Sequence, residues 1–128
     1  MGYFYTGFDY KNRKHGYFKI GETGQSNLGA RLSSIRQTDS FQCLGYIKLN
    51  DETHAERLLV ESYVRVMMER LPELTHIQND HYLYEIDNKD TKYEQAQKFA
   101  NEALYYAKHA CQMFNIQWEE GTKTFKRS

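Results

Sequence analysis

Residues 16–21, Gly-Tyr-Phe-Lys-Ile-Gly, decide the fold that this sequence predicts. Aromatic or apolar side chains alternate here with others, which is typical of a strand with one buried face. The alternation puts Phe18 and Ile20 on one side of the strand and Lys19 on the other. Gly21 and the polar residues after it have the composition of a turn. The segment therefore predicts a strand that presents Lys19, followed by a tight glycine turn.

The N-terminal residues are expected to pair with this strand. Residues 3–8 have strand composition, and Tyr5 alternates to the face opposite the phenylalanines. Residues 9–15 form a polar, basic connection between the two segments. Because so short a connection suits antiparallel neighbours, we expect a hairpin. If the phenylalanines face the core, Tyr5 and Lys19 project together from the other face, so a phenol lies beside an amine.

A short helix and a third strand are expected next. Ser26 or Asn27 is a plausible N-cap for a helix that ends at about Arg36. Arg31 falls about 60° from the apolar stripe of this helix, at the boundary of the buried face. There it can enter a site, or it can lay its stem on the core edge with its head in water. Residues 41–49 then have strand composition and can join the same sheet.

A long helix begins at Asp51 or Thr53 and is stopped by Pro72. Thr53 and Glu56 match the capping-box pattern. We expect Glu56 to lie on the flank of the buried stripe, where it either enters a site or only completes the capping box. Glu61 is expected to point toward solvent. The expected inner stripe consists of Ala55, Leu58, Leu59, Ser62, Tyr63 and Val66.

The C-terminal part predicts one clear helix. Residues 82–86 alternate in character and predict an edge strand or an extended loop, whereas residues 118–128 are polar and are expected to fray. Small residues repeat three and four apart through residues 90–114. Such a stripe packs into the core of the same chain or forms the seam of a homodimer. Its members are Tyr93, Ala96, Ala100, Ala103, Ala107, Ala110 and Phe114.

These elements predict a single domain, residues 1–128, of the α/β (α+β) class. The predicted architecture is a small three-stranded mixed or antiparallel sheet flanked by helices, in the order β-β-α-β-α-(β)-α. The sequence has eleven Tyr and seven Phe, so aromatic rings with a polar tip must supply much of the core.

Charge and composition exclude some classes of protein. The net charge is zero, which argues against coating nucleic acid by bulk electrostatics, but residues 1–49 hold seven Lys or Arg against three Asp or Glu. No apolar run approaches the roughly 20 residues that cross a bilayer, and no signal peptide is recognisable, so we expect a cytoplasmic protein without a membrane partner. Cys43 and Cys111 are expected to be reduced, buried thiols.

The order of these motifs resembles a known family. Residues 3–5 end in Tyr5, residues 19–21 read Lys-Ile-Gly, and Arg31 and Glu56 follow at the right spacing. This set resembles the GIY-YIG nuclease superfamily, in particular its phage and restriction-enzyme branch, in which lysine replaces the second tyrosine. The resemblance covers roughly residues 1–86, which would form the nuclease core.

The resemblance implies a metal-dependent endonuclease that hydrolyses phosphodiester bonds of DNA. Glu56 would be the only protein ligand of one divalent cation, Mg²⁺ or Mn²⁺. Tyr5 would be the general base or would orient the attacking water, and Lys19 would favour its phenolate or serve as the base itself. Arg31 would hold the scissile phosphate with its planar fork.

The chain also departs from the family at named positions. Ile35 stands where many relatives have a histidine, so His15 or His54 could substitute only if the fold brings it near; Asn79 is the nearest counterpart of a late asparagine. The alternative function is therefore a catalytically inactive module, on the same scaffold, that binds nucleic acid or a protein. Candidate substrate contacts in either case are Lys11, Arg13, Lys14, Tyr17, Thr23 and Arg36.

Overall fold

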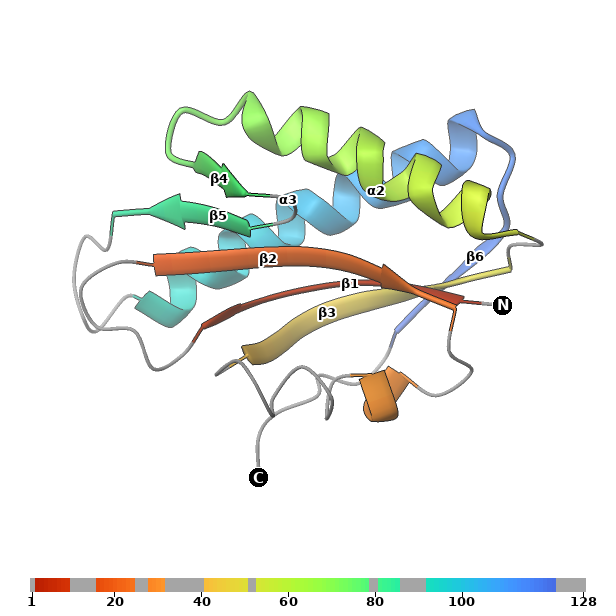
Figure 1. The fold of residues 1–128 in the computed structure, drawn as a ribbon, viewed down its shortest axis with the longest axis horizontal. Coiled ribbons are helices and arrows are strands. Elements are labelled where there is room, and N and C mark those ends of the chain that lie inside the picture. Colours follow the sequence, from red (N-terminus) through yellow and green to blue (C-terminus); the bar gives the residue numbers. More distant parts are fainter. Residues whose placement is uncertain are drawn as a thin grey trace.

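Six strands form one sheet in the order β4-β5-β2-β1-β3-β6, with antiparallel pairing throughout (Figure 1). The structure is a computed structural model, and it describes residues 2–9, 16–24, 28–31, 41–50, 53–78, 81–85 and 92–121. The strands are β1 (Gly2–Asp9), β2 (Gly16–Thr23), β3 (Phe41–Leu49), β4 (Thr75–Gln78), β5 (His81–Tyr84) and β6 (Trp118–Glu120). The long helices are α2 (His54–Glu69) and α3 (Lys92–Met113).

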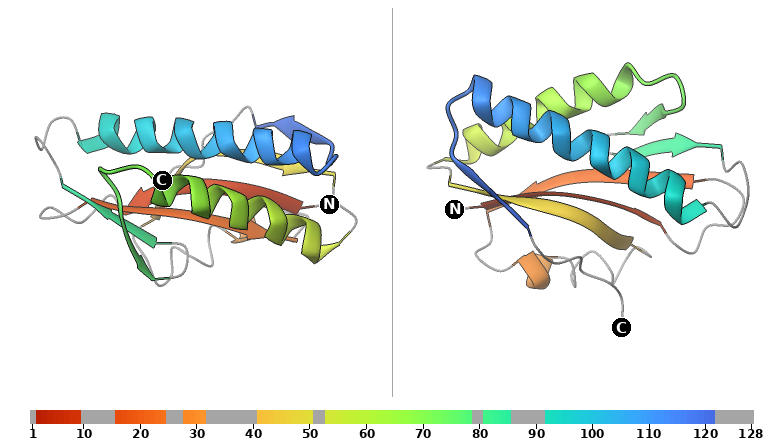
Figure 2. Two further views of the ribbon diagram at one scale, coloured as in Figure 1. Left: turned by 90° about the horizontal axis from the view of Figure 1, so that it is seen from above. Right: turned by 180° about the vertical axis from the view of Figure 1, so that it is seen from behind.

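The molecule is layered around this sheet. Both long helices cover one face, and a helical turn at residues 28–31 lies against the other (Figures 1 and 2). The larger apolar cluster fills the space between the sheet and the two helices, and includes Phe4, Phe18 and Ile20. A smaller cluster, on the side of the helical turn, is formed by Tyr5, Leu28, Phe41 and Cys43. The sheet is therefore buried on both faces along its centre.

The predicted mixed α+β class is confirmed, but the predicted three-stranded sheet is wrong. The segment at residues 82–86 contributes β5, which lies between β2 and β4 rather than at the edge. Trp118, in the tail that was expected to fray, belongs to β6 and pairs with Leu49. These strands have three or four residues each, too few for alternation to identify them, and they form because an existing strand offers its hydrogen-bonding edge.

The hairpin of β1 and β2 is confirmed, and its register corrects the role of Gly21. Tyr5 pairs with Gly21, and Gly7 pairs with Lys19. The strand continues through Gly21 to Thr23, so the turn predicted at this glycine is wrong. A Cβ atom at Gly21 would lie 2.6 Å from the ring of Tyr5. The glycine therefore permits close approach of a cross-strand ring.

A bulge in β3 changes which side chains face the helices. Thr6 pairs with Gly45 while Gly7 pairs with Cys43, so Leu44 is the extra residue. Because side chains alternate with a period of two, one extra residue moves the preceding part of the strand to the opposite face. This shift carries Cys43 away from the helices and into the smaller cluster.

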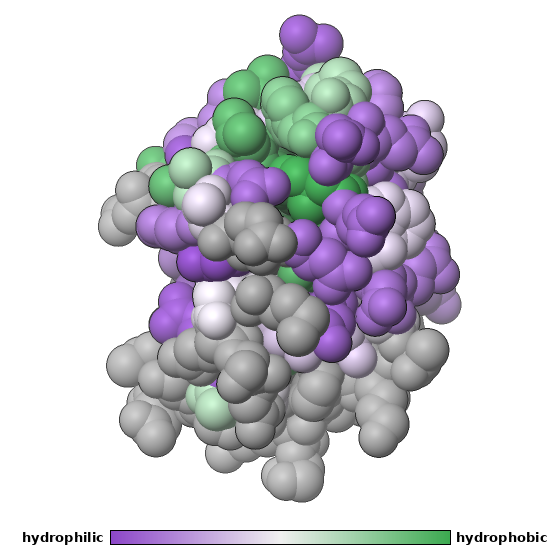
Figure 3. Space-filling view, turned by 90° about the vertical axis from the view of Figure 1, so that its right-hand side faces the viewer, coloured by the Kyte–Doolittle hydropathy of each residue, from purple (hydrophilic) through white to green (hydrophobic). Residues whose placement is uncertain are grey.

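The buried side of α2 is not the one that the apolar spacing predicted. Val60, Val64 and Met68 are fully buried, whereas Leu58 and Val66 are exposed. Helix α2 has two apolar stripes. The one that faces the sheet has its apolar residues four apart, at Val60, Val64 and Met68. Figure 3, which views the end of the molecule where α2 begins, shows apolar surface over the helical layer. Of the expected stripe, Tyr63 is half-buried, and the exposed members are Ala55, Leu58, Leu59, Ser62 and Val66.

The small-residue stripe of α3 packs inside the chain. Its alanines are fully buried against the sheet and α2. A Cβ atom at Gly45 of β3 would lie 2.5 Å from Leu104, so helix and strand approach closely here. The two ends of the stripe, Tyr93 and Phe114, are exposed. A homodimer through this helix stays a prediction, and it would have to use the outer face, where Tyr105 is exposed. The buried alanines are Ala96, Ala100, Ala103, Ala107 and Ala110.

Two expectations from composition can be compared with this fold. Cys43 and Cys111 are free and buried, as expected, and burial raises the pKa of the Cys111 thiol to about 11. None of the helices among the described residues is both long enough and apolar enough to span a membrane.

Candidate functional site

Charged side chains gather in an open depression where β2 ends and α2 begins. The depression has a volume of about 420 Å³. Three separate segments meet there: the end of β2, the helical turn at 28–31 and the first turn of α2. Its lining residues are Glu22, Thr23, Gly24, Arg31, His54 and Arg57.

Strand β2 delivers Glu22 to this depression. Glu22 continues the alternation of Phe18 and Ile20, so it points to the same face of the sheet as those core residues. It pairs with Phe4 of β1, near the end of the hairpin. Its side chain is only 12% exposed. A carboxylate buried to this extent requires compensating partners.

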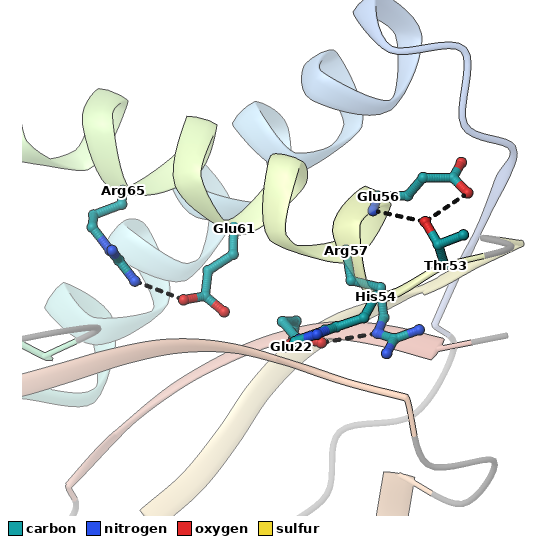
Figure 4. Close-up of polar contacts among 7 residues, drawn as sticks. All are labelled: Glu22, Thr53, His54, Glu56, Arg57, Glu61 and Arg65. Atoms are coloured by element: carbon teal, nitrogen blue, oxygen red, sulfur yellow. Dashed lines mark hydrogen bonds and ion pairs between the residues drawn. The ribbon is translucent and has the colours of Figure 1, made fainter.

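The start of α2 supplies those partners. Thr53 is the N-cap, and its side chain accepts a hydrogen bond from the backbone N–H of Glu56 at 3.3 Å. This cap fixes where the helix begins, so His54 and Arg57 lie three residues apart on one side of its first turn. Both side chains point toward Glu22 (Figure 4).

Glu22 is held at both of its carboxylate oxygens. Arg57 Nε donates to Glu22 Oε2 at 2.9 Å, and His54 Nε2 lies 2.9 Å from Glu22 Oε1 (Figure 4). The Arg57 side chain is 14% exposed, whereas that of His54 is 60% exposed. The ion pair is therefore largely shielded from water, and the imidazole remains accessible to solvent and solutes.

The charges in the depression favour an anion. Among the described residues that line the depression, Arg31 and Arg57 contribute two guanidinium groups and Glu22 contributes one carboxylate, so their summed charge is positive even with His54 neutral. A planar guanidinium fork matches the oxygens of a phosphate or a carboxylate. A phosphate group is thus an appropriate ligand for this surface.

Two of the predicted site residues, Arg31 and Thr23, line this depression. Arg31 is partly exposed, as its expected position at the boundary of the buried face implied. Leu28, one helical turn earlier, packs into the smaller cluster with Tyr5. That contact holds the turn so that Arg31 reaches the end of β2.

Tyr5, Tyr17 and Lys19 lie on the face of the sheet opposite Glu22. Tyr5 and Lys19 occupy diagonal positions across the hairpin, as predicted. Tyr5, however, is only 1% exposed, and the ring of Phe41 packs edge-on against its ring, with 6.0 Å between the ring centroids. Tyr17 and Lys19 are partly exposed. The ring of Tyr5 is therefore buried among apolar neighbours, whereas the side chain of Lys19 is partly exposed.

Of the two carboxylates of α2, Glu56 has the second of its two expected roles, and Glu61 does not lie where it was expected. Glu56 completes the capping box, with its Oε1 at 3.4 Å from Thr53 Oγ1, and its side chain points away from Glu22 (Figure 4). Glu61, predicted to face solvent, is 12% exposed and is bonded to Arg65 at 2.7 Å. The physical reason is the rotation of α2 about its own axis. Because Val60, Val64 and Met68 are its buried residues, Glu61 is turned toward the sheet and Glu56 is turned aside.

The remaining predicted site residues lie outside the described residues. These are Lys11, Arg13, Lys14 and Arg36, together with His15, Ile35 and Asn79. In the part of the chain that the structure describes, no three His, Cys, Asp or Glu side chains are placed to hold a metal ion together.

The sequence predictions missed Glu22 and Arg57. The alternation of Phe18, Ile20 and Glu22 was a usable signal, but interpreting Gly21 as a turn cut the strand short. His54 was identified only as a conditional substitute for a missing histidine, and the fold brings it into the same depression as Arg31.

Comparison of this chain with protein-family models, curated proteins and solved structures found no match. The resemblance to the GIY-YIG superfamily therefore rests on sequence motifs alone, and a function has to be argued from the site.

Proposed function

We propose that this chain is a phosphodiester hydrolase of the GIY-YIG endonuclease type that acts on DNA. The observation that carries the proposal is the position of Arg31, which lines an open, positively charged depression together with residues from two other segments. Arg31 would bind the scissile phosphate and stabilise the charge that develops on it during attack by water. The sequence resemblance assigns the same role to this arginine.

His54 supports hydrolysis rather than binding alone. A solvent-accessible imidazole in the depression, bonded to Glu22, is a group that can transfer protons during phosphodiester cleavage. Ile35 stands where many relatives of the resembled family have a histidine, and we propose that His54 takes the part of that histidine.

Lys19 would contact the nucleic acid away from the bound phosphate. Lys19 and Thr23 share one face of β2 and are separated by four residues, which is about 13 Å of strand. A lysine at that distance from the depression would contact a phosphate further along the same nucleic acid. We therefore propose a substrate-binding role for Lys19.

The predicted Mg²⁺ or Mn²⁺ ion does not fit Glu56 as its ligand beside Arg31. The carboxylate of Glu56 is directed away from Glu22 and Arg57 and lies against the N-cap threonine (Figure 4). The carboxylate that does line the depression, Glu22, is held by Arg57 and His54.

A second candidate is a DNA-binding module without catalytic activity. The covered phenol of Tyr5 and the orientation of Glu56 favour it, because both residues belong to the catalytic set that the resemblance implies. In this case Arg31 would still bind a phosphate, and no bond would be broken.

The test is an assay of the purified chain with supercoiled plasmid and with labelled double-stranded, single-stranded and branched DNA. Each substrate is incubated with Mg²⁺, with Mn²⁺ and with a chelator. We expect cleavage by the wild-type chain and a large loss in Arg31→Ala. Binding of DNA without cleavage under every condition would favour the inactive module, and neither binding nor cleavage would refute both candidates.

A further inference from the structure

We propose that Arg57 is a second phosphate-binding residue of this site and that Glu22 is the residue that positions it. The inference rests on the proposed function, since it assigns two residues that neither the motifs nor the resemblance identified. It explains why a carboxylate lies in a depression that otherwise favours anions.

Glu22 constrains the side chain of Arg57. Its Nε donates to Glu22 Oε2 at 2.9 Å, and the other oxygen of Glu22 is held by His54 at the same distance. Glu22 and Arg57 are both largely buried, so this contact is less screened by water than a surface ion pair. The arginine side chain is therefore fixed at its Nε, and its planar group has a defined orientation.

The Nη2 end of the Arg57 guanidinium lies next to Gly24. A Cβ atom at Gly24 would lie 2.6 Å from Nη2 and 2.9 Å from Cζ of Arg57. The guanidinium therefore passes directly over Gly24, at the wall of the depression. Arg57 and Arg31 both line the depression. Two guanidinium groups from different elements can thus act on one phosphate backbone.

Phosphate binding by Arg57 and simple anchoring of α2 to β2 have different experimental consequences. An ion pair that only ties α2 to β2 would influence stability, and its loss would change DNA binding no more than any other loss of stability. A positioned phosphate ligand makes a different prediction, because moving the guanidinium without removing its charge would weaken binding. Gly24 offers such a change, since it is exposed and a Cβ atom there would displace the guanidinium of Arg57.

The experiment measures binding of a fluorescein-labelled DNA duplex by anisotropy, with a chelator present so that cleavage does not interfere. Gly24→Ala keeps every charge and displaces the guanidinium, and we expect it to weaken binding about three- to tenfold at a temperature at which both proteins are fully folded. Arg57→Ala should weaken binding about tenfold and reduce the slope of log affinity against log salt by about 0.9, as expected for one lost phosphate contact. The control is Arg70→Ala, an exposed arginine at the far end of α2, which should bind within twofold of wild type.

Glu22 provides the test of positioning. Glu22→Gln keeps an oxygen that can accept from Arg57 Nε and removes a negative charge, so it should bind DNA as well as wild type or more tightly. Glu22→Ala removes the same charge and also the acceptor, and we expect weaker binding. If Glu22 acted only through its charge, both variants would bind more tightly.

The outcomes distinguish the inference from the proposed function. Wild-type binding that is weakened by Arg31→Ala but not by Gly24→Ala or Arg57→Ala would leave the proposed function standing and would reduce Arg57 to an anchor. Absence of DNA binding by the wild-type chain would refute the proposed function and this assignment together.

Discussion

The glycine in the Lys-Ile-Gly segment shows how a single residue can be misinterpreted from sequence. A glycine followed by polar residues is a common turn signal, but Gly21 lies inside β2, opposite Tyr5. What the glycine supplies is space for a ring on the neighbouring strand, and sequence alone does not show which ring will lie there. That space also explains how Tyr5 can be buried under Phe41 on the same face.

Substitution of this glycine should therefore destabilise the fold. We expect Gly21→Ala to lower the free energy of unfolding by about 1–3 kcal/mol, because the added Cβ atom would overlap the Tyr5 ring. The comparison is Gly24→Ala, whose Cβ atom would approach the guanidinium of Arg57 rather than a ring packed in the core. Urea unfolding of wild type and both variants measures the changes. Wild-type stability of Gly21→Ala would contradict the close approach of Tyr5.

At the scale of single residues, spacing predicted only part of the site. Thr23 ends the second strand of the hairpin, Arg31 lies in the helical turn that follows it, and both line the depression. Glu22 and Arg57 depend on a contact between residues 35 positions apart in the chain, which no local pattern reveals. His54 needed the same long-range contact before its role could be recognised.

Helix α2 shows the corresponding limit at the scale of an element. Its length, its N-cap and its end were predictable, but its rotation about its axis was not, because two apolar stripes compete for the buried side. The choice also decides which carboxylate faces the sheet, and it turns Glu61 inward instead of Glu56.

Two valines of α2 test this rotation directly. Val64 is fully buried and Val66 is 51% exposed, so the same substitution should have different costs. We expect Val64→Ala to lower the free energy of unfolding by about 2 kcal/mol and Val66→Ala to change it by less than about 0.5 kcal/mol. Chemical unfolding of both proteins measures this. A larger effect at Val66 would contradict this rotation and would support the buried stripe that the sequence predicted.

The whole molecule differs from the predicted one mainly in the width of its sheet. Composition and motif order were sufficient for a single mixed α+β domain with a central hairpin. They were insufficient for β4, β5 and β6, because such short strands depend on the edges that β2 and β3 offer them. The wider sheet gives α2 and α3 a continuous surface to cover, and it leaves the first turn of α2 at the end of β2 where the charged depression forms (Figure 1).

The single tryptophan reports whether this sheet unfolds as one unit. Trp118 lies in β6, is half-buried against the main cluster and lies under Lys108, whose Nζ is 5.5 Å from the ring centroid. We therefore expect its fluorescence and the helical circular dichroism signal to change at the same urea concentration. A fluorescence transition at clearly lower urea would mean that β6 frays separately, as the sequence had suggested.

The central claim is that Arg31 acts on a phosphodiester bond at the depression, and one kinetic comparison tests it most directly. The measurement is kcat/KM for cleavage of a labelled DNA substrate by wild type, Arg31→Ala and Arg70→Ala, under the conditions in which wild type is most active. We predict a loss of about 100-fold or more in Arg31→Ala, because a charge-stabilising donor is removed from the transition state, and wild-type activity in Arg70→Ala. Cleavage by Arg31→Ala at the wild-type rate would contradict the claim.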